Sequence, residues 1–377
     1  MEKITVVHYN EIATKGGNRA FFEKYLIDNI NKHIAGISKK KAERKYGRLI
    51  IRDCSDKLND VLGKIPGISG FGSGLSCDLD LDCIKQTALK IASPKEVYRI
   101  NTSRQNKTFK LKSPEISKEI AEFLHKNGKN ADHKDYTKEL FVEVCDKEAY
   151  LFEGSHNGLG GLPVGTTGKV LCLLSGGIDS PVSAFLSIKR GCSVDYIHFF
   201  NDTINSKSAL AKIKKLVEQL NIYQNGAKLF VVPFKDLQKE IILKVPSKYR
   251  MIVYKRFMFK LANILAFREK YKAVITGDNL GQVASQTLEN INTTYDASKK
   301  PIIHPVIGLD KLEIIQIAKK IGTYEISILP YEDCCSLLIS AHPETRSKLT
   351  EIEEFEKEIN RELLIKAIKS AEKIKYN

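Results

Sequence analysis

The order of hydrophobic and polar positions changes once along the chain, and the two patterns predict different folds. Up to residue 168, strand-like and helix-like segments follow one another without regular alternation, which is typical of α+β units. From Lys169 onward, apolar strands alternate with helices, which favours a parallel sheet with helices on both faces. Residues 154–168 are too rich in glycine to hold regular structure, so we expect a linker there.

The first pattern contains two small α+β units, separated by a glycine-rich stretch at residues 63–74. The first unit is expected to hold a strand, a helix and a strand, at residues 4–9, 19–34 and 48–52. In the second unit, helices are expected at residues 83–92 and 114–127 and a strand at 96–101. A hairpin is expected from residues 140–144 and 149–152.

The second pattern predicts a doubly wound parallel sheet. Its strands are expected at residues 170–174, 194–200, 228–232 and 273–276, and its helices at 181–190, 206–220 and 249–270. Residues 347–375 carry apolar positions at helical spacing among many charges, so we expect one long charged helix. The predicted fold class is therefore α/β and multidomain.

Composition narrows the class of protein. The chain has 377 residues, 42% of them hydrophobic and 28% charged, which is typical of a soluble globular protein. This length allows two or three domains of about 100–200 residues each. The longest apolar runs have the length of a strand, and the N-terminus lacks the apolar core of a secretory signal. We expect a cytoplasmic protein without a membrane span.

Positive charge points to a polyanionic partner. Sixty Lys and Arg against 45 Asp and Glu give a net charge of +15, although a lysine-rich soluble surface would give the same number. Local peaks lie at residues 39–45 and 99–112, and the second also carries polar side chains suited to phosphate and sugar contacts. A solvated face remains the alternative for both. The candidate nucleic-acid contacts are Lys39, Lys40, Lys41, Arg44, Lys45, Arg104, Lys107, Lys110 and Lys112.

Eight cysteines form no regular disulfide framework, and most are expected to be reduced, buried thiols. Cys334 and Cys335 differ because they are adjacent within a polar, turn-like stretch, where a small core residue would be out of place. No C-x-x-C or His cluster accompanies the pair, so we expect no protein-held metal there.

The motif that indicates chemistry is Ser-Gly-Gly-Ile-Asp-Ser at residues 175–180, between an apolar strand and a helix with Pro181 in its first turn. Glycines allow close approach of an anion, the hydroxyls donate hydrogen bonds, and the helix N-terminus offers unpaired N–H groups. The motif is neither a Walker A loop nor a dinucleotide fingerprint. Asp179 either orients magnesium-bound pyrophosphate or caps the helix.

This loop resembles the pyrophosphate loop of the ATP pyrophosphatases. Together with residues 158–169, 276–288, 322–327 and 331–335, it resembles the tRNA 4-thiouridine synthetase family over nearly the whole chain. The resemblance implies a ferredoxin-like domain at 1–75, a THUMP RNA-binding domain at 76–167 and a PP-loop catalytic domain at 168–377.

The resemblance implies that ATP adenylates O4 of a tRNA uridine, at position 8, and that cysteine-borne sulfur then displaces AMP. Cys335 is favoured as the catalytic cysteine over Cys334, with ATP and Mg²⁺ as cofactors. No iron–sulfur cluster is expected, because residues 251–254 lack the C-x-x-C that some relatives carry there. The implied ATP-binding residues are Leu173, Leu174, Ser175, Gly176, Gly177, Asp179, Ser180, His198, Phe199, Lys255, Gly277 and Gln286.

The expected partners are tRNA, a second copy of the chain in a homodimer, and a separate sulfur donor. The chain has no room for the rhodanese domain of some relatives, so sulfur is expected from a cysteine desulfurase, a rhodanese-like protein or sulfide. The rival enzyme functions are modification of another tRNA base and sulfur transfer for the thiazole of thiamine. A non-enzymatic RNA-binding protein is the third possibility.

Overall fold

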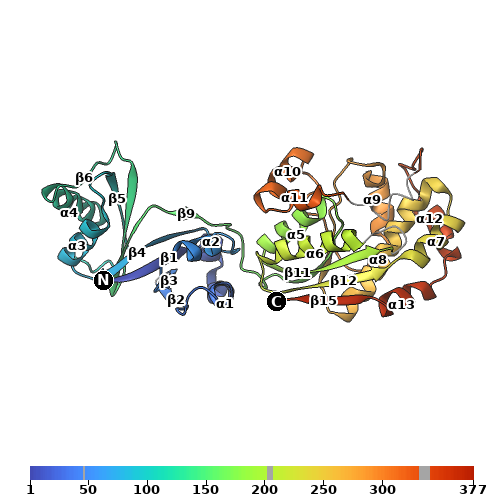
Figure 1. Cartoon of the computed structure of the whole chain (residues 1–377), viewed down its shortest axis with the longest axis horizontal. Helices are drawn as coiled ribbons and strands as arrows, with labels where there is room; N and C mark the ends of the chain where they lie inside the picture. Colours follow the sequence, from blue (N-terminus) through green and yellow to red (C-terminus); the bar gives the residue numbers. More distant parts are fainter. Residues whose placement is uncertain (46, 202–206, 331–339) are drawn as a thin grey trace. The chain divides into compact units, whose positions relative to one another are not determined.

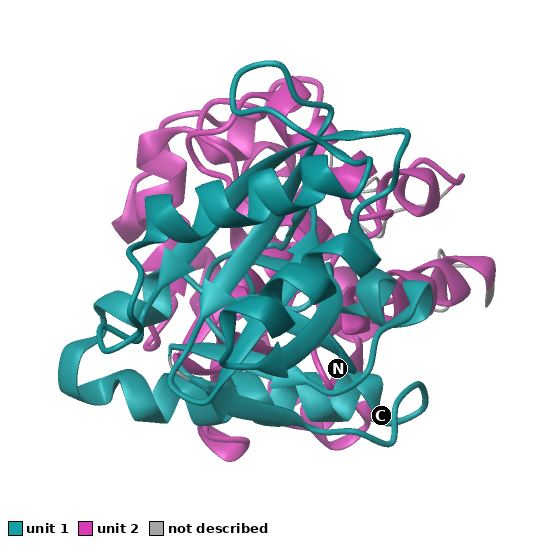
Figure 2. Ribbon diagram, turned by 90° about the vertical axis from the view of Figure 1, so that its left-hand side faces the viewer, with its two compact units in different colours: residues 1–166 teal, residues 167–377 magenta. Residues whose placement is uncertain are grey.

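The computed structural model describes residues 1–45, 47–201, 207–330 and 340–377. The chain forms two compact units, Met1–Thr166 and Thr167–Asn377, which Figure 2 distinguishes by colour. Among the described residues, no helix combines the length and the apolar character needed to cross a bilayer.

The N-terminal unit is built on one nine-stranded sheet with the order β2-β3-β1-β4-β8-β7-β5-β6, to which the short β9 adds by pairing with β4. Its strands are β1 (Glu2–His8), β2 (Ala42–Lys45), β3 (Arg48–Ile51), β4 (Gly70–Asp78), β5 (Val97–Arg104), β6 (Asn130–Ala131), β7 (Lys138–Val144), β8 (Glu148–Glu153) and β9 (His156–Asn157). Its helices are α1 (Arg19–Ile34), α2 (Asp56–Leu62), α3 (Leu81–Ile91) and α4 (Ser113–Lys126).

Strand β4 joins the two α+β halves of this unit. One core packs α1 and α2 around residues such as Leu26 and Leu58, and another packs α3 and α4 around residues such as Ile84 and Ile120. The expected domain limit at residue 75 lies inside β4, which pairs with β1 and with β8. Gly70, Gly72 and Gly74 of the expected separator belong to this strand, and a Cβ at Gly74 would lie 1.9 Å from the carbonyl oxygen of Leu151.

The expected linker is fixed to the N-terminal unit over most of its length. The N–H groups of Gly158 and Gly160 donate to the carbonyls of Ser69 and Ile68 at 3.1 and 2.7 Å. Further on, the Asn29 side chain donates to the carbonyl of Val164 at 3.1 Å. The expectation of irregular structure at residues 154–168 is therefore wrong for β9, which pairs with β4.

The C-terminal unit has a six-stranded sheet with the order β14-β13-β10-β11-β12-β15. Its strands are β10 (Gly168–Leu173), β11 (Cys192–Phe200), β12 (Ala227–Pro233), β13 (Ala273–Ile275), β14 (Ile302–Ile303) and β15 (Glu372–Tyr376). Its helices are α5 (Asp179–Lys189), α6 (Lys207–Asn221), α7 (Lys235–Lys244), α8 (Arg250–Arg268), α9 (Leu288–Tyr295), α10 (Lys311–Lys320), α11 (Tyr324–Ser327), α12 (Leu349–Glu358) and α13 (Glu362–Lys369).

Helices cover both faces of this sheet (Figure 1). Alternate strand residues such as Leu171, Phe230 and Val232 form a core with α7, α8, α12 and α13. The opposite face packs against α5 and α6. Strands β10 to β14 pair in parallel, as predicted, because each is followed by a crossover that returns the chain to the same edge.

The C-terminal tail is not the single helix that we predicted. Residues 347–375 form α12, α13 and most of β15, which runs antiparallel on the edge strand β12. Ile359 after α12 is extended, and the Asn360 side chain accepts from the N–H of Glu362 at 3.0 Å, so the first helix stops and a second begins. Ile374 and Tyr376 then follow the two-residue period of a strand.

Candidate active site

The glycine-rich loop after β10 is closed on itself by its two serines. The Ser180 side chain accepts from the N–H of Ser175 at 2.9 Å, and the two hydroxyls lie 3.1 Å apart. The N–H of Gly177 donates to the Ser175 hydroxyl at 3.3 Å, while Gly176 is buried and Gly177 exposed. The loop is thus preformed at the N-terminus of α5, where the helix dipole favours an anion.

Gly277 lies at the carboxyl end of the neighbouring β13 and packs directly on this loop. A Cβ there would lie 2.6 Å from the backbone nitrogen of Ser180, closer than real Cβ atoms approach. Only glycine therefore lets the β13 end reach the start of α5. The structure thus places Gly277 beside the loop, while its contact with ATP stays a prediction.

Asp179 reaches across the loop toward α10. Its carboxylate accepts from the Lys311 ammonium at 2.6 Å and from the Gln282 side chain at 3.1 Å. No side-chain capping bond is present at the start of α5, so the capping alternative for Asp179 is not seen. The structure instead places a carboxylate and an ammonium together at the mouth of the loop.

Sequence reasoning missed Lys311, although a local signal exists. Asp310 and Glu313 form a capping box that places Lys311 in the first turn of α10. A cation at a helix N-terminus opposes the dipole, so an anionic partner is the expected compensation. Here that partner is Asp179, and phosphate oxygens could take its place.

A second cluster surrounds Asp278, which follows β13. Its carboxylate accepts from the Lys255 ammonium at 2.9 Å, from the Gln286 side chain at 3.1 Å and from the Tyr295 hydroxyl at 3.0 Å. Burial raises the pKa of Asp278, but Lys255 and the two other donors outweigh it and lower the pKa to about 2. Lys255 is therefore held by a buried carboxylate, and Asp278 and Tyr295 join the expected Lys255 and Gln286.

Gln286 adds an acceptor to this cluster. Its Oε1 atom is buried and has no hydrogen-bond partner among the described residues, while its Nε2 is used by Asp278. A buried polar atom without a partner costs free energy, so a ligand donor is its natural complement. The amino group of adenine and the hydroxyls of ribose are donors of this kind.

Leu173, Leu174, His198 and Phe199 lie at the carboxyl ends of β10 and β11. The buried His198 donates from Nδ1 to the carbonyl of Leu174 at 2.8 Å, which joins the two strand ends. The Phe199 ring packs edge-to-face on Phe234, with centroids 5.4 Å apart, inside the core. This leaves the backbone of Phe199, rather than its ring, for contact with a nucleotide.

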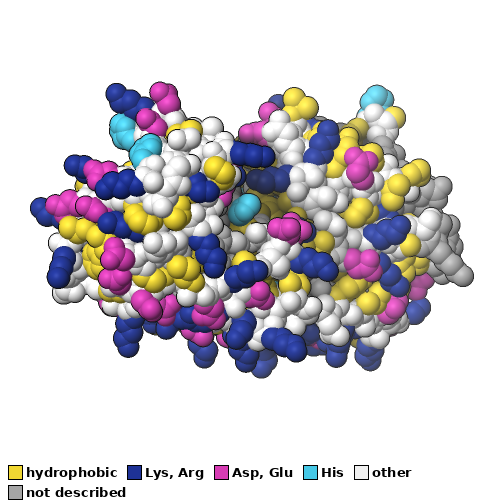
Figure 3. Space-filling view, turned by 60° about the vertical axis from the view of Figure 1, so that its left-hand side comes forward, with side chains coloured by type: hydrophobic (Ala, Val, Ile, Leu, Met, Phe, Trp, Pro, Cys, Tyr) yellow, Lys and Arg dark blue, Asp and Glu magenta, His cyan; other side chains and the backbone are white. Residues whose placement is uncertain are grey.

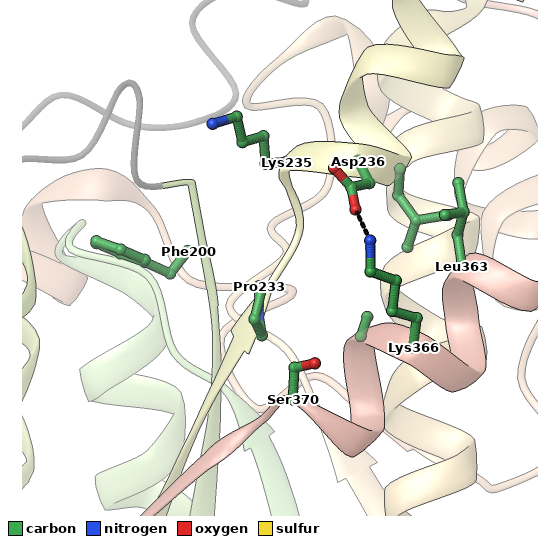
Figure 4. Close-up of a pocket in the computed structure, with 9 residues that line it drawn as sticks. Phe200, Pro233, Lys235, Asp236, Leu363, Lys366 and Ser370 are labelled. Carbon is green, nitrogen blue, oxygen red and sulfur yellow. Dashed lines mark hydrogen bonds and ion pairs between the residues drawn. The ribbon is translucent and has the colours of Figure 1, made fainter.

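A cavity of about 300 Å³ lies further along the same sheet edge, at the ends of β11 and β12. Figure 4 shows Phe200, Pro233 and Ser370 around it, with Asp236 and Lys366 joined by an ion pair of 2.7 Å. The charges of that pair neutralise each other, and Lys235 lines the same cavity.

The two predicted cysteines lie in residues 331–339, outside the described residues. The other six are free thiols. Burial raises the pKa of Cys172 and raises that of Cys145 to about 11, so these thiols are poor nucleophiles. This agrees with the expectation that the cysteines outside the pair are reduced.

The basic candidates differ in their surroundings. Lys39, Lys40 and Lys41 are exposed between α1 and β2, whereas Arg44 pairs with Glu23 at 2.7 Å and Lys45 lies 3.9 Å from Glu43. Figure 3 shows Lys and Arg side chains interspersed with acidic ones over the visible face.

In the second basic segment, Arg104 has a structural role, because its guanidinium donates to the carbonyls of Phe109 and Leu111 at 2.8 and 3.3 Å. Lys107, Lys110 and Lys112 are exposed on the loop that Arg104 holds.

Family models match three successive parts of the chain. The model described as "Thiamine biosynthesis protein (ThiI)" matches residues 165–361. This range includes the loop at residues 175–180, the Asp179–Lys311 pair, the Asp278 cluster and the cysteine pair. The chain belongs to the ThiI family. The ThiI ferredoxin-like model matches residues 4–72 and the THUMP model residues 79–152. The predicted fold class is thereby confirmed, with β15 as an antiparallel addition to the parallel sheet.

Relatives in the ThiI family match at full length. A probable tRNA sulfurtransferase of Thermoanaerobacter sp. is 40% identical over 95% of this chain and 96% of its own. One of Moorella thermoacetica is 37% identical over 94% of this chain and 92% of its own.

Among solved structures, a 4-thiouridine synthetase in complex with RNA and bound ATP is 34% identical, with a TM-score of 0.92 over 100% of both chains. PH1313 of Pyrococcus horikoshii, 24% identical with a TM-score of 0.66 over 85% of this chain and 99% of that one, shares the fold.

Proposed function

We propose that this chain is an ATP-dependent tRNA sulfurtransferase that converts a tRNA uridine, at position 8, to 4-thiouridine. The observation that carries the proposal is the match over the whole chain to a 4-thiouridine synthetase solved with RNA and ATP. The preformed loop at residues 175–180 gives this match a physical basis, because it offers an anion site at a helix N-terminus.

The loop with Lys311 and the cluster around Asp278 offer complementary groups to the two parts of ATP. In the proposal, the loop and Lys311 bind the phosphates, and the Lys255–Asp278–Gln286 cluster lies on the side of the nucleoside. Asp179 would hold Mg²⁺ together with phosphate oxygens and water, as is usual for this ion. Among the described residues, no group of three or more His, Cys, Asp or Glu could hold a metal ion.

Adenylation makes the uracil O4 a leaving group, because a phosphate ester departs more readily than a carbonyl oxygen. The terminal sulfur of a persulfide on Cys335 then attacks C4, and AMP leaves with the former O4. Attack by the Cys334 thiolate on the sulfur of Cys335 cleaves the remaining S–S bond and releases 4-thiouridine. The resulting Cys334–Cys335 disulfide is reset by an external dithiol.

Two parts of the proposal concern partners. We expect sulfur to come from the persulfide of a separate cysteine desulfurase or rhodanese-like protein, which passes its outer sulfur to Cys335, or from sulfide. Sulfide is too reduced to form that persulfide, so it would attack C4 of the adenylated uracil directly, with AMP as the leaving group. Supplying each donor to the purified enzyme distinguishes them. We also expect a homodimer, which light scattering would test. The THUMP match favours RNA as substrate, whereas the description of the main family model keeps thiamine thiazole as a second sulfur acceptor.

The central experiment incubates purified protein with tRNA, ATP, Mg²⁺ and a sulfur source, and measures nucleosides by mass spectrometry. We expect pyrophosphate, AMP and 4-thiouridine, and release of ADP would exclude the pyrophosphatase mechanism. Cys335→Ser should retain ATP binding and lose 4-thiouridine. If Cys335→Ser is fully active and Cys334→Ser is dead, the roles of the two thiols are reversed.

A further inference from the structure

A second cavity, of about 380 Å³, lies in the C-terminal unit, and we call it the apolar cavity. Lys248, Met251 and Ile252 at the start of α8 form one wall, and residues 283–285 form another. Its third wall comes from Ser340, Pro343 and Glu344. The volume is in the range of small-molecule sites, and most of the lining is apolar.

Two chain segments connect the apolar cavity to the candidate active site. Gln282 donates to Asp179 of the loop, and the next residue, Val283, lines the cavity. The short 3-10 turn Ala284–Gln286 then carries Gln286 to Asp278. On α8, Met251 lines the cavity one turn before Lys255, which also binds Asp278. Two walls of the cavity are therefore formed by sequence neighbours of residues in the loop region and in the Asp278 cluster.

The third wall is continuous in sequence with the cysteine pair. Ser340 directly follows the segment 331–339, which carries Cys334 and Cys335 and lies outside the described residues. One wall of the apolar cavity thus begins at the residue that follows, in sequence, the segment assigned above to sulfur transfer. Adenylation and sulfur transfer both act on the C4–O4 carbonyl of one base.

A base within stacked RNA cannot undergo this chemistry, because attack at C4 comes from the face of the ring. Enzymes that modify bases turn the base out, cover its faces with apolar or aromatic groups and read its polar edge. The apolar cavity has both kinds of group. Met251, Ile252 and Val283 offer apolar surface for the ring faces, and the Lys248–Glu344 pair, at 3.5 Å, supplies a polar edge.

Glu344 is held in place by several bonds. Its N–H donates to the carbonyl of Lys248 at 3.1 Å, and its carboxylate accepts from the N–H groups of Arg346 and Thr345 at 2.9 and 3.0 Å. The hydrogen bond from the Arg346 N–H and the nearby Lys248 ammonium lower the pKa of Glu344, and together they outweigh the opposing effect of burial. The carboxylate is therefore ionised and only accepts hydrogen bonds. Uracil has an N3–H donor beside O4, whereas cytosine has a lone pair there.

We propose that the apolar cavity receives the uracil that is thiolated, turned out of the RNA, with Glu344 accepting its N3–H. The inference rests on the proposed function and names the place of the substrate base within it.

Photo-crosslinking tests the location of the base. Wild-type protein is mixed with ATP and tRNA in which 5-bromouridine replaces the uridine at position 8, and cross-linked peptides are mapped by mass spectrometry. We expect peptides that contain Met251 or Val283. Cross-links elsewhere, or none in residues 167–377, overturn the proposal.

Filling the cavity tests its use. Val283→Trp should lower tRNA-dependent pyrophosphate release and 4-thiouridine formation at least about tenfold, with ATP affinity unchanged. Leu243→Trp is the matched control, because Leu243 is also an exposed apolar residue but lies on α7 outside the cavity, and it should be neutral. Normal pyrophosphate release by Val283→Trp, with thiolation restored by free sulfide, would make the cavity a docking site for a sulfur carrier and overturn the proposal.

Failure of the proposed function itself would differ from both results. In that case wild-type protein would release no pyrophosphate with any tRNA, whatever its cross-links. The two hypotheses are therefore tested separately.

Discussion

At the scale of single residues, Lys255 and Asp278 connect folding with function. The Asp278 pKa of about 2, against an ordinary value of 3.8, means that the ionised form is favoured in the folded protein. The difference corresponds to about 2 kcal/mol of stability. Because the pKa is depressed, this stability is present above about pH 4 and is lost as the pH falls toward 2.

Lys255→Met should destabilise the protein by roughly 3 kcal/mol at pH 7, because a buried carboxylate loses its cation. Without Lys255 the pKa of Asp278 should rise, so its carboxyl becomes protonated at a higher pH than in wild type. The difference in free energy of unfolding between the variant and wild type should therefore be smaller at pH 4 than at pH 7. Urea unfolding at both pH values measures this. Lys244→Met is the control, since Lys244 pairs with Glu240 on the surface and should change stability by less than about 0.5 kcal/mol. Equal losses in both variants would contradict the account.

Lys311→Met should separate catalysis from stability. The Lys311–Asp179 pair is partly exposed, so its loss should change the free energy of unfolding by at most about 1 kcal/mol. Loss of a preorganised cation at the phosphates should lower pyrophosphate release by about 100-fold. Lys320→Met, at the other end of α10, should be fully active. Normal activity of Lys311→Met would exclude Lys311 from phosphate binding.

The residues of the site that could be predicted are those within local motifs. Residues 175–180 carry their own strand, turn and helix start, so their placement follows from neighbouring sequence. The partners of Asp179 could not be found in this way, because Gln282 and Lys311 are 103 and 132 residues away. Gln286 was expected from the family motif, but its bond to Asp278 follows from the turn at 284–286.

At the scale of elements, the alternation of strands and helices predicts most of the C-terminal sheet. It misses the short strand β14, the helices α7, α9, α10 and α11, and the end of the chain. Strand β15 has the sequence EKIKY, in which only Ile374 and Tyr376 are apolar, so charges hide its two-residue period. The pairing of β15 with β12 depends on tertiary structure and cannot be found from the local sequence. Strand β15 covers the edge of β12, whose residues Leu229 and Phe230 are fully buried.

Removal of residues 372–377 should therefore destabilise the C-terminal unit and promote aggregation. The truncation exposes the β12 edge, which is apolar and lacks a pairing partner on that side. We expect a loss of at least about 2 kcal/mol from the ladder bonds and Ile374. Thermal unfolding and size-exclusion chromatography test this, with removal of Asn377 alone as the control. A monodisperse truncated protein of wild-type stability would show that β15 has no such role.

At the scale of the whole molecule, only some of the basic side chains are available to bind RNA. Arg44 and Arg104 are occupied by Glu23 and by loop carbonyls, so charge count alone overstates the groups available to RNA. Lys107, Lys110 and Lys112 are exposed on one loop. They are stronger candidates for phosphate contacts than Arg44 and Arg104.

Changing Lys107, Lys110 and Lys112 together to Ala should weaken tRNA binding and make it less dependent on salt. Three lost phosphate contacts should reduce the slope of log K against log salt by about 2, because each contributes roughly 0.7–0.9. Binding measured over a salt series checks this. A matched change of Lys348, Lys357 and Lys369, exposed near the C-terminus, should leave the slope unaltered. Equal slopes for all three proteins would place the RNA contacts elsewhere.

The connection before the C-terminal unit is hydrogen-bonded on both of its sides. The carbonyl of Val164 accepts from Asn29, the N–H of Thr166 donates to the carbonyl of Pro163 at 3.2 Å, and the N–H of Thr167 donates to the carbonyl of Gly191 at 3.1 Å. Residues up to Thr166 are thus held by the first unit and Thr167 by the second, so only the peptide between them belongs to neither.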